Sequence, residues 1–328
     1  MRITFVLPGY PWRPGGRRPK SLDFLYRILR PVRDEAWYIV VEGSHRLSAR
    51  WSRRLGTTQV KRNPELIVSL TTIPERIRKV HLCLDSLLRQ SIKPDRIILW
   101  LGMTNGDRDF PFPPTHLPRP LERMQRRGVE IRWCKDIRSF KKIIPAMRAY
   151  PEALIVTADD DVFYPKEWLE QLFEAYRKEP QHIHCHRAHL VRYNKAGEPL
   201  PYREWDFLAL GFQGPSLDLF PTGVGGVLYA PGHLNPEALN EVSFLALCPC
   251  ADDVWLKAMS LLNHVSCKKT GSGGMRFRPM RFANNRALET FNLAGNGNDA
   301  QIEAVRRKYG TFASLAERNP NHAELQRR

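Results

Sequence analysis

The sequence has no apolar run of the roughly 18 to 20 residues that a transmembrane helix requires. The N-terminal apolar stretch, residues 3–7, is also too short for the core of a signal peptide. Both absences lead us to expect a cytoplasmic protein. The 328 residues, 42% of them hydrophobic, suffice for one large folded domain or two small ones.

Paired cysteine motifs are absent too. The six cysteines are scattered and no two of them form a C-x-x-C pair, so we expect reduced, structural thiols. The stretch 182–186 reads His-Ile-His-Cys-His, which suggests a metal cluster at first sight. In a strand, however, the three histidines would share one face and Cys185 would face the other way. A zinc site at this stretch is therefore disfavoured.

The sequence carries no nucleic-acid-binding motif, and few aromatic residues interleave with its basic ones. Its formal net charge is nevertheless +17, and residues 1–62 hold 12 Arg and 2 Lys against 2 Asp and 2 Glu. Such a segment attracts polyanions, either nucleic acid or an anionic membrane leaflet, unless it is merely a soluble basic surface. We treat 1–62 as a basic N-terminal region and expect no nucleic-acid partner.

The most informative stretch is 154–165, Leu-Ile-Val-Thr-Ala-Asp-Asp-Asp-Val-Phe-Tyr-Pro. It starts as an apolar run typical of a buried strand and ends in Asp159, Asp160 and Asp161. Adjacent carboxylates repel one another, so a buried strand end with three of them needs a cation nearby. Mg²⁺ and Mn²⁺ bind through carboxylates plus substrate phosphates, and open α/β sheets bind ligands at the carboxyl ends of strands. The pattern predicts a metal–diphosphate site, and the alternative is a solvated acidic turn.

Strand-like and helix-like segments alternate from about residue 63 onward. Apolar runs predict strands at 66–70, 96–100, 129–134 and 154–158, and helical spacing of apolar residues predicts helices over 77–88, 119–127 and 143–150. This alternation predicts an α/β domain with a mostly parallel central sheet flanked by helices. We expect the domain to span 63–310 and a tail to follow over 311–328.

Three further segments complete the pattern. Residues 221–229 read as a glycine-punctuated strand, which suggests close approach of the backbone to a ligand or to another strand. Asp252 and Asp253 open a helix, where acidic residues can also be simple N-caps. Within the basic region, residues 37–41, Trp-Tyr-Ile-Val-Val, are strand-like.

In their order and spacing, these motifs resemble the bacterial family 2-like glycosyltransferases of the GT-A fold, from about residue 64 to about 310. The triple Asp matches the DxD motif, which in such enzymes holds Mn²⁺ or Mg²⁺ and the nucleotide diphosphate; Asp159 and Asp161 would be the metal ligands. Asp252-Asp253 matches the acidic motif that supplies the catalytic base in inverting members, with Asp-Asp where the common form is Glu-Asp. Either carboxylate can be the base, and we favour Asp253.

The resemblance also implies binding residues. Segment 69–76 matches the one that lines the nucleoside pocket. The residues implied to bind the nucleotide are Thr71, Arg76, Asp136, Lys141, Lys142, Asp159 and Asp160. Gly225 and Gly226 are assigned to the acceptor side, and Trp205 either stacks on an acceptor sugar or packs in the core.

The implied activity is metal-dependent transfer of a sugar from a nucleotide diphosphate sugar to a glycan or lipid-linked acceptor, with inversion, in surface polysaccharide assembly. Contact of residues 1–62 with the anionic inner face of the cell membrane would suit a lipid-linked acceptor. Two other hypotheses remain open. The acidic clusters would also suit a metal-dependent phosphoesterase, and the chain could be a non-catalytic protein that binds carbohydrate or nucleotide.

Overall fold

The computed structural model describes residues 20–103, 117–271, 277–280 and 297–313. The predicted tail over 311–328 lies outside these residues from position 314 onward, and the basic region lies outside them up to position 19. The chain divides into two units, Met1–Leu47 and Ser48–Arg328. Helix α1 (Lys20–Trp51) is the described element of the first unit, and its last turn belongs to the second.

Helix α1 shows that the strand predicted over residues 37–41 is wrong. The apolar, β-branched composition of this stretch suits a strand, but β propensity depends strongly on context. Here the stretch lies inside a helix of 32 residues, in which Arg46 donates a 2.5 Å hydrogen bond to Glu42 one turn earlier. Once a helix has formed, each added residue gains a backbone hydrogen bond, so continuation outweighs the local composition.

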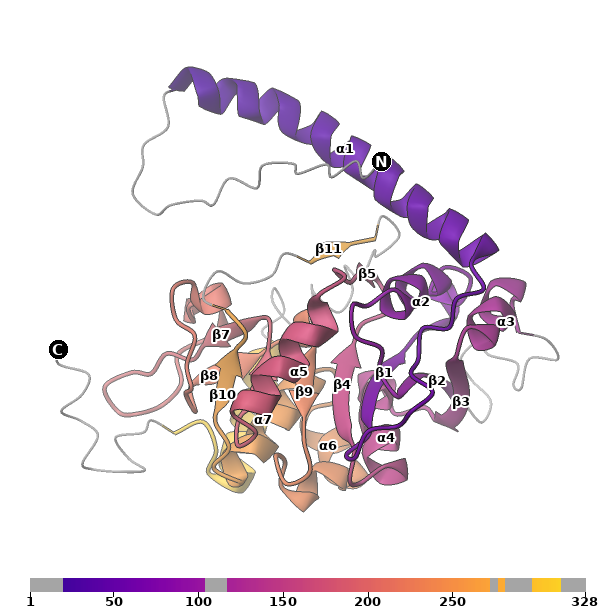
Figure 1. Ribbon diagram of the computed structural model, residues 1–328. Coiled ribbons are helices and arrows are strands. Elements are labelled where there is room, and N and C mark those ends of the chain that lie inside the picture. The colour runs from indigo at the N-terminus through magenta and orange to yellow at the C-terminus, as the bar shows by residue number, and fades with distance from the viewer. Residues whose placement is uncertain (1–19, 104–116, 272–276, 281–296, 314–328) are drawn as a thin grey trace. The chain divides into compact units, whose positions relative to one another are not determined.

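A mixed sheet of seven strands forms the centre of the second unit (Figure 1). In their order across the sheet, the strands are β10 (Cys267–Lys269), β6 (Ile183–Cys185), β9 (Val227–Tyr229), β4 (Leu154–Ala158), β1 (Leu66–Thr71), β2 (Arg96–Met103) and β3 (Val129–Lys135). Strands β4, β1, β2 and β3 are parallel neighbours, and β10 is parallel to β6. Strand β9 runs antiparallel to β4 and β6. The predicted α/β fold with a mostly parallel sheet is confirmed.

Helices cover both faces of this sheet. On one face lie α2 (His81–Leu88), α3 (Arg119–Arg126) and α5 (Trp168–Lys178), and on the other α4 (Ile144–Ala149), α6 (Glu241–Leu247), α7 (Asp252–Leu262) and α9 (Gly297–Tyr309). Ile67 and Ile155 pack into one core with Trp255 of α7. Val68 and Val156, which point to the opposite face, are equally buried. A sheet buried on both faces leaves its strand ends as the place where side chains meet a ligand.

Shorter elements complete the second unit. Two antiparallel ribbons pair β5 (Val162–Phe163) with β11 (Arg278–Pro279) and β7 (Ala188–Leu190) with β8 (Leu219–Pro221). The single-turn 3₁₀ helices are η1 (Pro74–Arg76), η2 (Arg138–Lys142), η3 (Tyr202–Glu204), η4 (Phe207–Ala209), η5 (Gly223–Gly225) and η6 (Pro236–Leu239). Four of these turns, η1, η2, η3 and η5, carry or adjoin predicted site residues.

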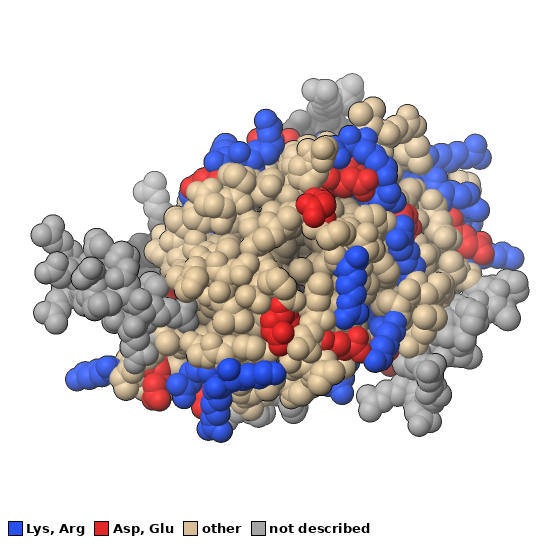
Figure 2. Space-filling view, turned by 90° about the horizontal axis from the view of Figure 1, so that it is seen from below, with Lys and Arg blue, Asp and Glu red and all other residues tan. Residues whose placement is uncertain are grey.

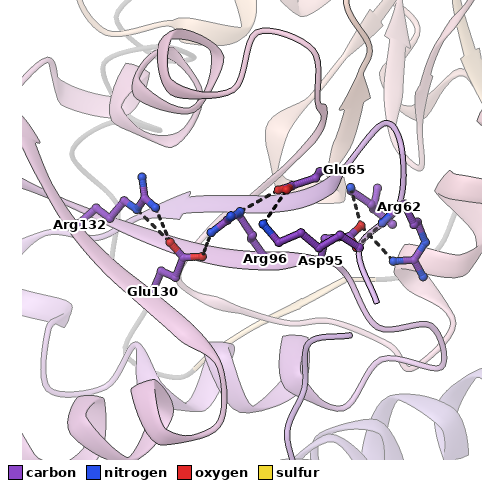
Figure 3. Close-up of polar contacts among 8 residues, drawn as sticks. Arg62, Glu65, Asp95, Arg96, Glu130 and Arg132 are labelled. Atoms are coloured by element: carbon purple, nitrogen blue, oxygen red, sulfur yellow. Dashed lines mark hydrogen bonds and ion pairs between the residues drawn. The ribbon is translucent and has the colours of Figure 1, made fainter. Parts of the chain in front are cut away.

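A chain of ion pairs links the starts of the first three strands (Figure 3). Arg96 on β2 lies 2.8 Å from Glu65, just before β1, and 2.6 Å from Glu130 on β3. Glu130 in turn lies 2.6 Å from Arg132. Asp95 accepts backbone hydrogen bonds of 2.8 Å from Arg62, which precedes β1, and from Leu66, the first residue of β1. These contacts hold the strands in register at the end of the sheet opposite to the three aspartates.

On the face seen from below in Figure 2, Lys and Arg side chains lie among Asp and Glu side chains, around a broad uncharged area. No helix in the described part of the chain combines the length and the apolarity needed to cross a membrane.

Candidate functional site

The predicted site residues gather at the carboxyl ends of β1 and β4. These strands are parallel neighbours, and Leu70 pairs with Ala158 where they end. Because both strands run in the same direction, the residues that follow them leave the sheet side by side. After β1 the chain continues into Thr72 and η1, and after β4 it continues into the three aspartates.

Asp160 is the inward-facing member of the triple Asp. It is 6% exposed and accepts hydrogen bonds of 2.5 Å from both Arg76 and the hydroxyl of Thr72. Burial raises the pKa of Asp160, and the positive charge of Arg76 opposes that effect. The same Arg76 nitrogen lies 2.9 Å from Asp161. Arg76 therefore joins the turn after β1 to two of the three carboxylates.

Asp159 and Asp161 flank Asp160 in the sequence and are only partly buried. Burial raises the pKa of Asp161 to about 6, and the negative charge of Asp159 contributes to that shift. A divalent cation would relieve this repulsion, and carboxylate oxygens are the ligands that Mg²⁺ and Mn²⁺ prefer. Within the described residues, no group of three or more His, Cys, Asp or Glu side chains is arranged to hold a metal by itself. A metal held by Asp159 and Asp161 would therefore need further ligands, such as substrate phosphates, and it would share the two carboxylates with Lys142 and Arg76.

Lys142 connects the triple Asp to the acidic pair at the start of α7. Its ammonium group lies 3.2 Å from Asp159 and 2.8 Å from Asp252. Lys142 is 7% exposed, and its pKa lies well above the ordinary value because nearby carboxylates outweigh the cost of its burial. Two acidic motifs that are about 90 residues apart in the sequence therefore share one buried cation.

Asp252 and Asp253 have different surroundings. Asp252 is paired with Lys142, whereas Asp253 accepts a 3.0 Å hydrogen bond from the backbone amide of Gly223. Burial raises the pKa of Asp253 to about 7, the charge of Asp252 adds to the shift, and Lys142 and the Gly223 amide oppose it. Asp253 is thus a carboxylate that can gain and lose a proton near neutral pH.

The turn η5 and the residue after it require glycine, because neighbouring side chains leave no room for a Cβ atom. A Cβ atom at position 223 would lie 2.6 Å from Nζ of Lys142, and one at position 226 would lie 2.4 Å from the ring of Trp168, where φ is also +82°. The Trp168 indole donates a 2.8 Å hydrogen bond to the carbonyl of Gly225. Gly225 and Gly226, assigned to the acceptor side from the sequence, therefore pack against the chain itself.

Several other predicted residues also contact the protein's own groups. Trp205 is 3% exposed and donates a 2.8 Å hydrogen bond to the carbonyl of Leu200, so the structure favours core packing over stacking on a sugar. The hydroxyl of Thr71 donates to the carbonyl of Trp100 at 2.8 Å. The Thr71 hydroxyl therefore bonds to β2. The hydroxyl that bonds to an aspartate of the triple Asp is that of Thr72, which donates to Asp160.

Asp136 and Lys141 form a second pair, 2.5 Å apart, near Gly102 at the end of β2. Burial would raise the pKa of Asp136, but the hydrogen bond and charge of Lys141 outweigh it, and the pKa lies below its ordinary value. Among the described contacts, none joins this pair directly to the three aspartates. The pair lies instead beside the end of β2, and Lys141 directly precedes Lys142 in the sequence.

Sequence reasoning missed two polar residues of the site, namely Thr72 and Thr222. Which of the two adjacent threonines, Thr71 or Thr72, faces the aspartates depends on where β1 ends, and the sequence does not give that end to within one residue. The hydroxyl of Thr222 is buried and has no hydrogen-bond partner among the described residues, and the same is true of one terminal nitrogen of Arg76. Buried polar groups are normally paired, so such atoms mark a place where a ligand or water is expected.

No protein-family model matches the chain, and no curated protein matches it. Among solved structures, a UTP-bound UGPase from Acinetobacter baumannii is similar at 12% identity and a TM-score of 0.36, covering 74% of this chain and 92% of that chain. A CMP:2-keto-3-deoxy-manno-octonic acid synthetase complexed with CTP is similar at 12% identity and a TM-score of 0.34, covering 74% and 96%. Likeness at these TM-scores assigns no activity to this chain.

Proposed function

We propose that this protein is a metal-dependent glycosyltransferase that moves a sugar from a nucleotide diphosphate sugar to a hydroxyl of a glycan or lipid-linked acceptor, with inversion. The observation that carries the proposal is the contact of Lys142 with both Asp159 and Asp252. It brings a pair of carboxylates suited to a metal and a diphosphate next to a carboxylate suited to proton removal. The resemblance of the sequence motifs to the GT-A glycosyltransferases supports the same conclusion.

On the donor side, Asp159 and Asp161 would hold Mn²⁺ or Mg²⁺ together with the diphosphate. The metal, when bound, supplies Lewis-acid stabilisation of the leaving diphosphate. Lys142, beside Asp159, would add a fixed positive charge to the same leaving group. Thr71, Arg76, Asp136 and Lys141 surround the neighbouring strand ends, where we place the nucleoside.

On the acceptor side, we assign Asp253 as the general base. It would take the proton of the acceptor hydroxyl while that oxygen attacks the anomeric carbon and the bond from this carbon to the diphosphate breaks. A base with a pKa near 7 is well matched to this task at neutral pH. Asp252, paired with Lys142, would hold the cation in place. A single direct displacement inverts the anomeric centre.

The proposal includes two further parts. We assign the activity to residues 63–310, and we expect residues 1–62 to bind anionic membranes, through which the chain would meet a lipid-linked acceptor. Co-sedimentation with vesicles that contain phosphatidylserine, at low and high salt, tests the second part. Absence of binding at low salt would contradict it.

The central experiment is a panel of nucleotide sugars incubated with the protein and Mn²⁺, Mg²⁺ or EDTA, and scored by release of free nucleoside diphosphate. We expect slow hydrolysis of one donor that EDTA abolishes. Asp161→Asn should lower this rate by at least about 100-fold, because it weakens the metal site. Asp206→Asn is the matched control, since Asp206 is an exposed aspartate paired with Arg192.

Other outcomes identify the alternatives. Release of phosphate or cleavage of simple phosphodiesters without use of a nucleotide sugar would favour the phosphoesterase. Formation of a nucleoside triphosphate from a nucleotide sugar and pyrophosphate would indicate nucleotidyl transfer instead. Binding of a donor that persists in Asp161→Asn, with no turnover in the unmodified protein, would favour a binding protein.

A further inference from the structure

Arg187 differs from the other basic residues of the site because its charge has no partner in the part of the chain that the structure describes. It lies just before β7 and is partly buried, and its guanidinium forms no hydrogen bond or ion pair with any described residue. By contrast, Arg76, Lys141 and Lys142 are each paired with an aspartate. A guanidinium presents five donors in a planar fork, and on Arg187 the described residues leave these donors available to a ligand.

The backbone fixes Arg187 beside Asp253. The amide of Thr222 donates a 3.0 Å hydrogen bond to the carbonyl of Arg187, and the next amide, that of Gly223, donates a 3.0 Å hydrogen bond to the carboxylate of Asp253. Two successive amides of one turn thus hold the two residues. The Cβ of Arg187 also lies 2.8 Å from the position that a Cβ of Gly225 would occupy, so the stem of the side chain packs on η5.

Tyr202 is affected by both charges. Alternate residues of an extended segment share a face, so Arg187 lies on the same face as His189, whose ring is 5.7 Å from that of Tyr202. Burial raises the pKa of Tyr202, the negative charge of Asp253 raises it further, and the positive charge of Arg187 opposes the shift. Arg187 and Asp253 are thus both close enough to Tyr202 to influence its ionisation.

We propose that Arg187 binds an anionic group, a phosphate or a carboxylate, of the acceptor whose hydroxyl faces Asp253. The planar fork of arginine matches both anions with two parallel hydrogen bonds. The anion would supply the partner that Arg187 lacks, and the two residues would together orient the acceptor. This inference rests on the proposed transferase function, and it narrows the substrate class to acceptors that carry a negative charge.

The test compares acceptors that differ in charge. Methyl glucoside, glucuronic acid and glucose 6-phosphate are offered to the protein with the donor that it hydrolyses. We expect a KM at least about tenfold lower for the two anionic sugars, since a charge-assisted hydrogen bond contributes a factor of about 10 to 100. Arg187→Gln should raise the KM of the anionic sugars to that of the neutral one, and Arg187→Lys should recover part of the difference.

Arg192→Gln is the control, because Arg192 is an exposed arginine nearby in the sequence that is paired with Asp206. It should behave as the unmodified protein. The inference is overturned if anionic and neutral sugars are used equally, or if Arg187→Gln affects both classes to the same extent. If none of the sugars is used as an acceptor, calorimetric titration measures the binding of glucuronic acid and glucose 6-phosphate instead. Equal binding to the unmodified protein and to Arg187→Gln would show that Arg187 does not bind the anionic group.

The two proposals fail in different ways. Absence of metal-dependent donor hydrolysis in the unmodified protein would contradict the transferase, whatever Arg187 does. Donor hydrolysis without any preference for anionic sugars would leave the transferase standing and remove the role of Arg187.

Discussion

The ammonium group of Lys142 contacts two carboxylates at once: it lies 2.8 Å from Asp252 and 3.2 Å from Asp159. Asp252 begins α7 and Asp159 follows β4, so one buried lysine joins two elements that the chain order keeps far apart. The pairing also distinguishes the two neighbouring aspartates of α7. Asp252 is neutralised by the lysine, whereas Asp253 is held by a backbone amide and keeps a raised pKa.

Replacing Lys142 by methionine should therefore damage both stability and activity. The change keeps most of the side-chain volume but leaves Asp159 and Asp252 without their cation, and breaking a buried ion pair costs about 3 to 5 kcal/mol. Urea denaturation measures the loss in the free energy of unfolding. Lys135→Met is the matched control, because Lys135 is an exposed lysine paired with Glu241 and its loss should cost no more than about 1 kcal/mol. Equal effects of the two changes would contradict the bridging role.

Replacing Asp253 by asparagine should abolish proton removal and leave the fold intact. An asparagine oxygen can still accept the hydrogen bond from the Gly223 amide, but it cannot take a proton. We expect transfer to fall by about 10²- to 10⁴-fold, with the affinity for nucleoside diphosphate unchanged. In the unmodified protein, the rate should fall as the pH drops below about 7, because Asp253 then becomes protonated. A pH profile of kcat without an acid limb near this value would argue against Asp253 as the base.

Buried histidines should make the protein sensitive to acid. Burial lowers the pKa of His186 to about 4 and that of His189 to about 3, and the charge of Arg187 adds to the second shift. The unfolded chain takes up protons at these positions below about pH 6.5 while the folded chain does not, so the free energy of unfolding falls as the pH drops through this range. By pH 4, each of these two histidines lowers the free energy of unfolding by on the order of 3 kcal/mol.

The pH dependence can be assigned to one residue. His189→Asn removes one titrating group and keeps an acceptor for the amide of Leu208, which donates to His189 at 2.9 Å. The slope of unfolding free energy against pH should become shallower between pH 6.5 and 4. His264→Asn serves as the control, because His264 is exposed and asparagine tolerates its φ of +54°. An unchanged slope in His189→Asn would show that this histidine does not contribute.

Much of the fold could be predicted from local sequence patterns. Apolar, β-branched runs identified β1 to β4, and their alternation with helical segments implied a parallel sheet, because parallel strands need crossover connections. The prediction was wrong over residues 37–41, where composition favoured a strand and the structure continues α1. Short apolar runs do not distinguish a strand from part of a long helix, since the competing hydrogen bonds come from residues outside the run.

The individual contacts of the site could be predicted less well. The triple Asp marked the strand end, but the pattern did not reveal that Asp160 turns inward to Arg76 and Thr72. The sequence analysis chose Thr71 over Thr72 as a binding residue. It left open whether Trp205 stacks on an acceptor sugar or packs in the core. Which of two adjacent side chains faces a neighbouring loop depends on where the strand ends and on what packs against it, and neither is a local property.

The sequence by itself determined the strands and helices of the sheet domain, the position of the carboxylates after β4, and the acidic start of α7. These features follow from hydrophobic periodicity and residue chemistry, which act over a few residues. Only the tertiary structure decided that Lys142 joins the two acidic motifs, that the pKa of Asp253 is raised, and that Arg187 has no partner among the described residues. These properties depend on distances and burial between segments remote in the chain, because charge interactions and desolvation act through space.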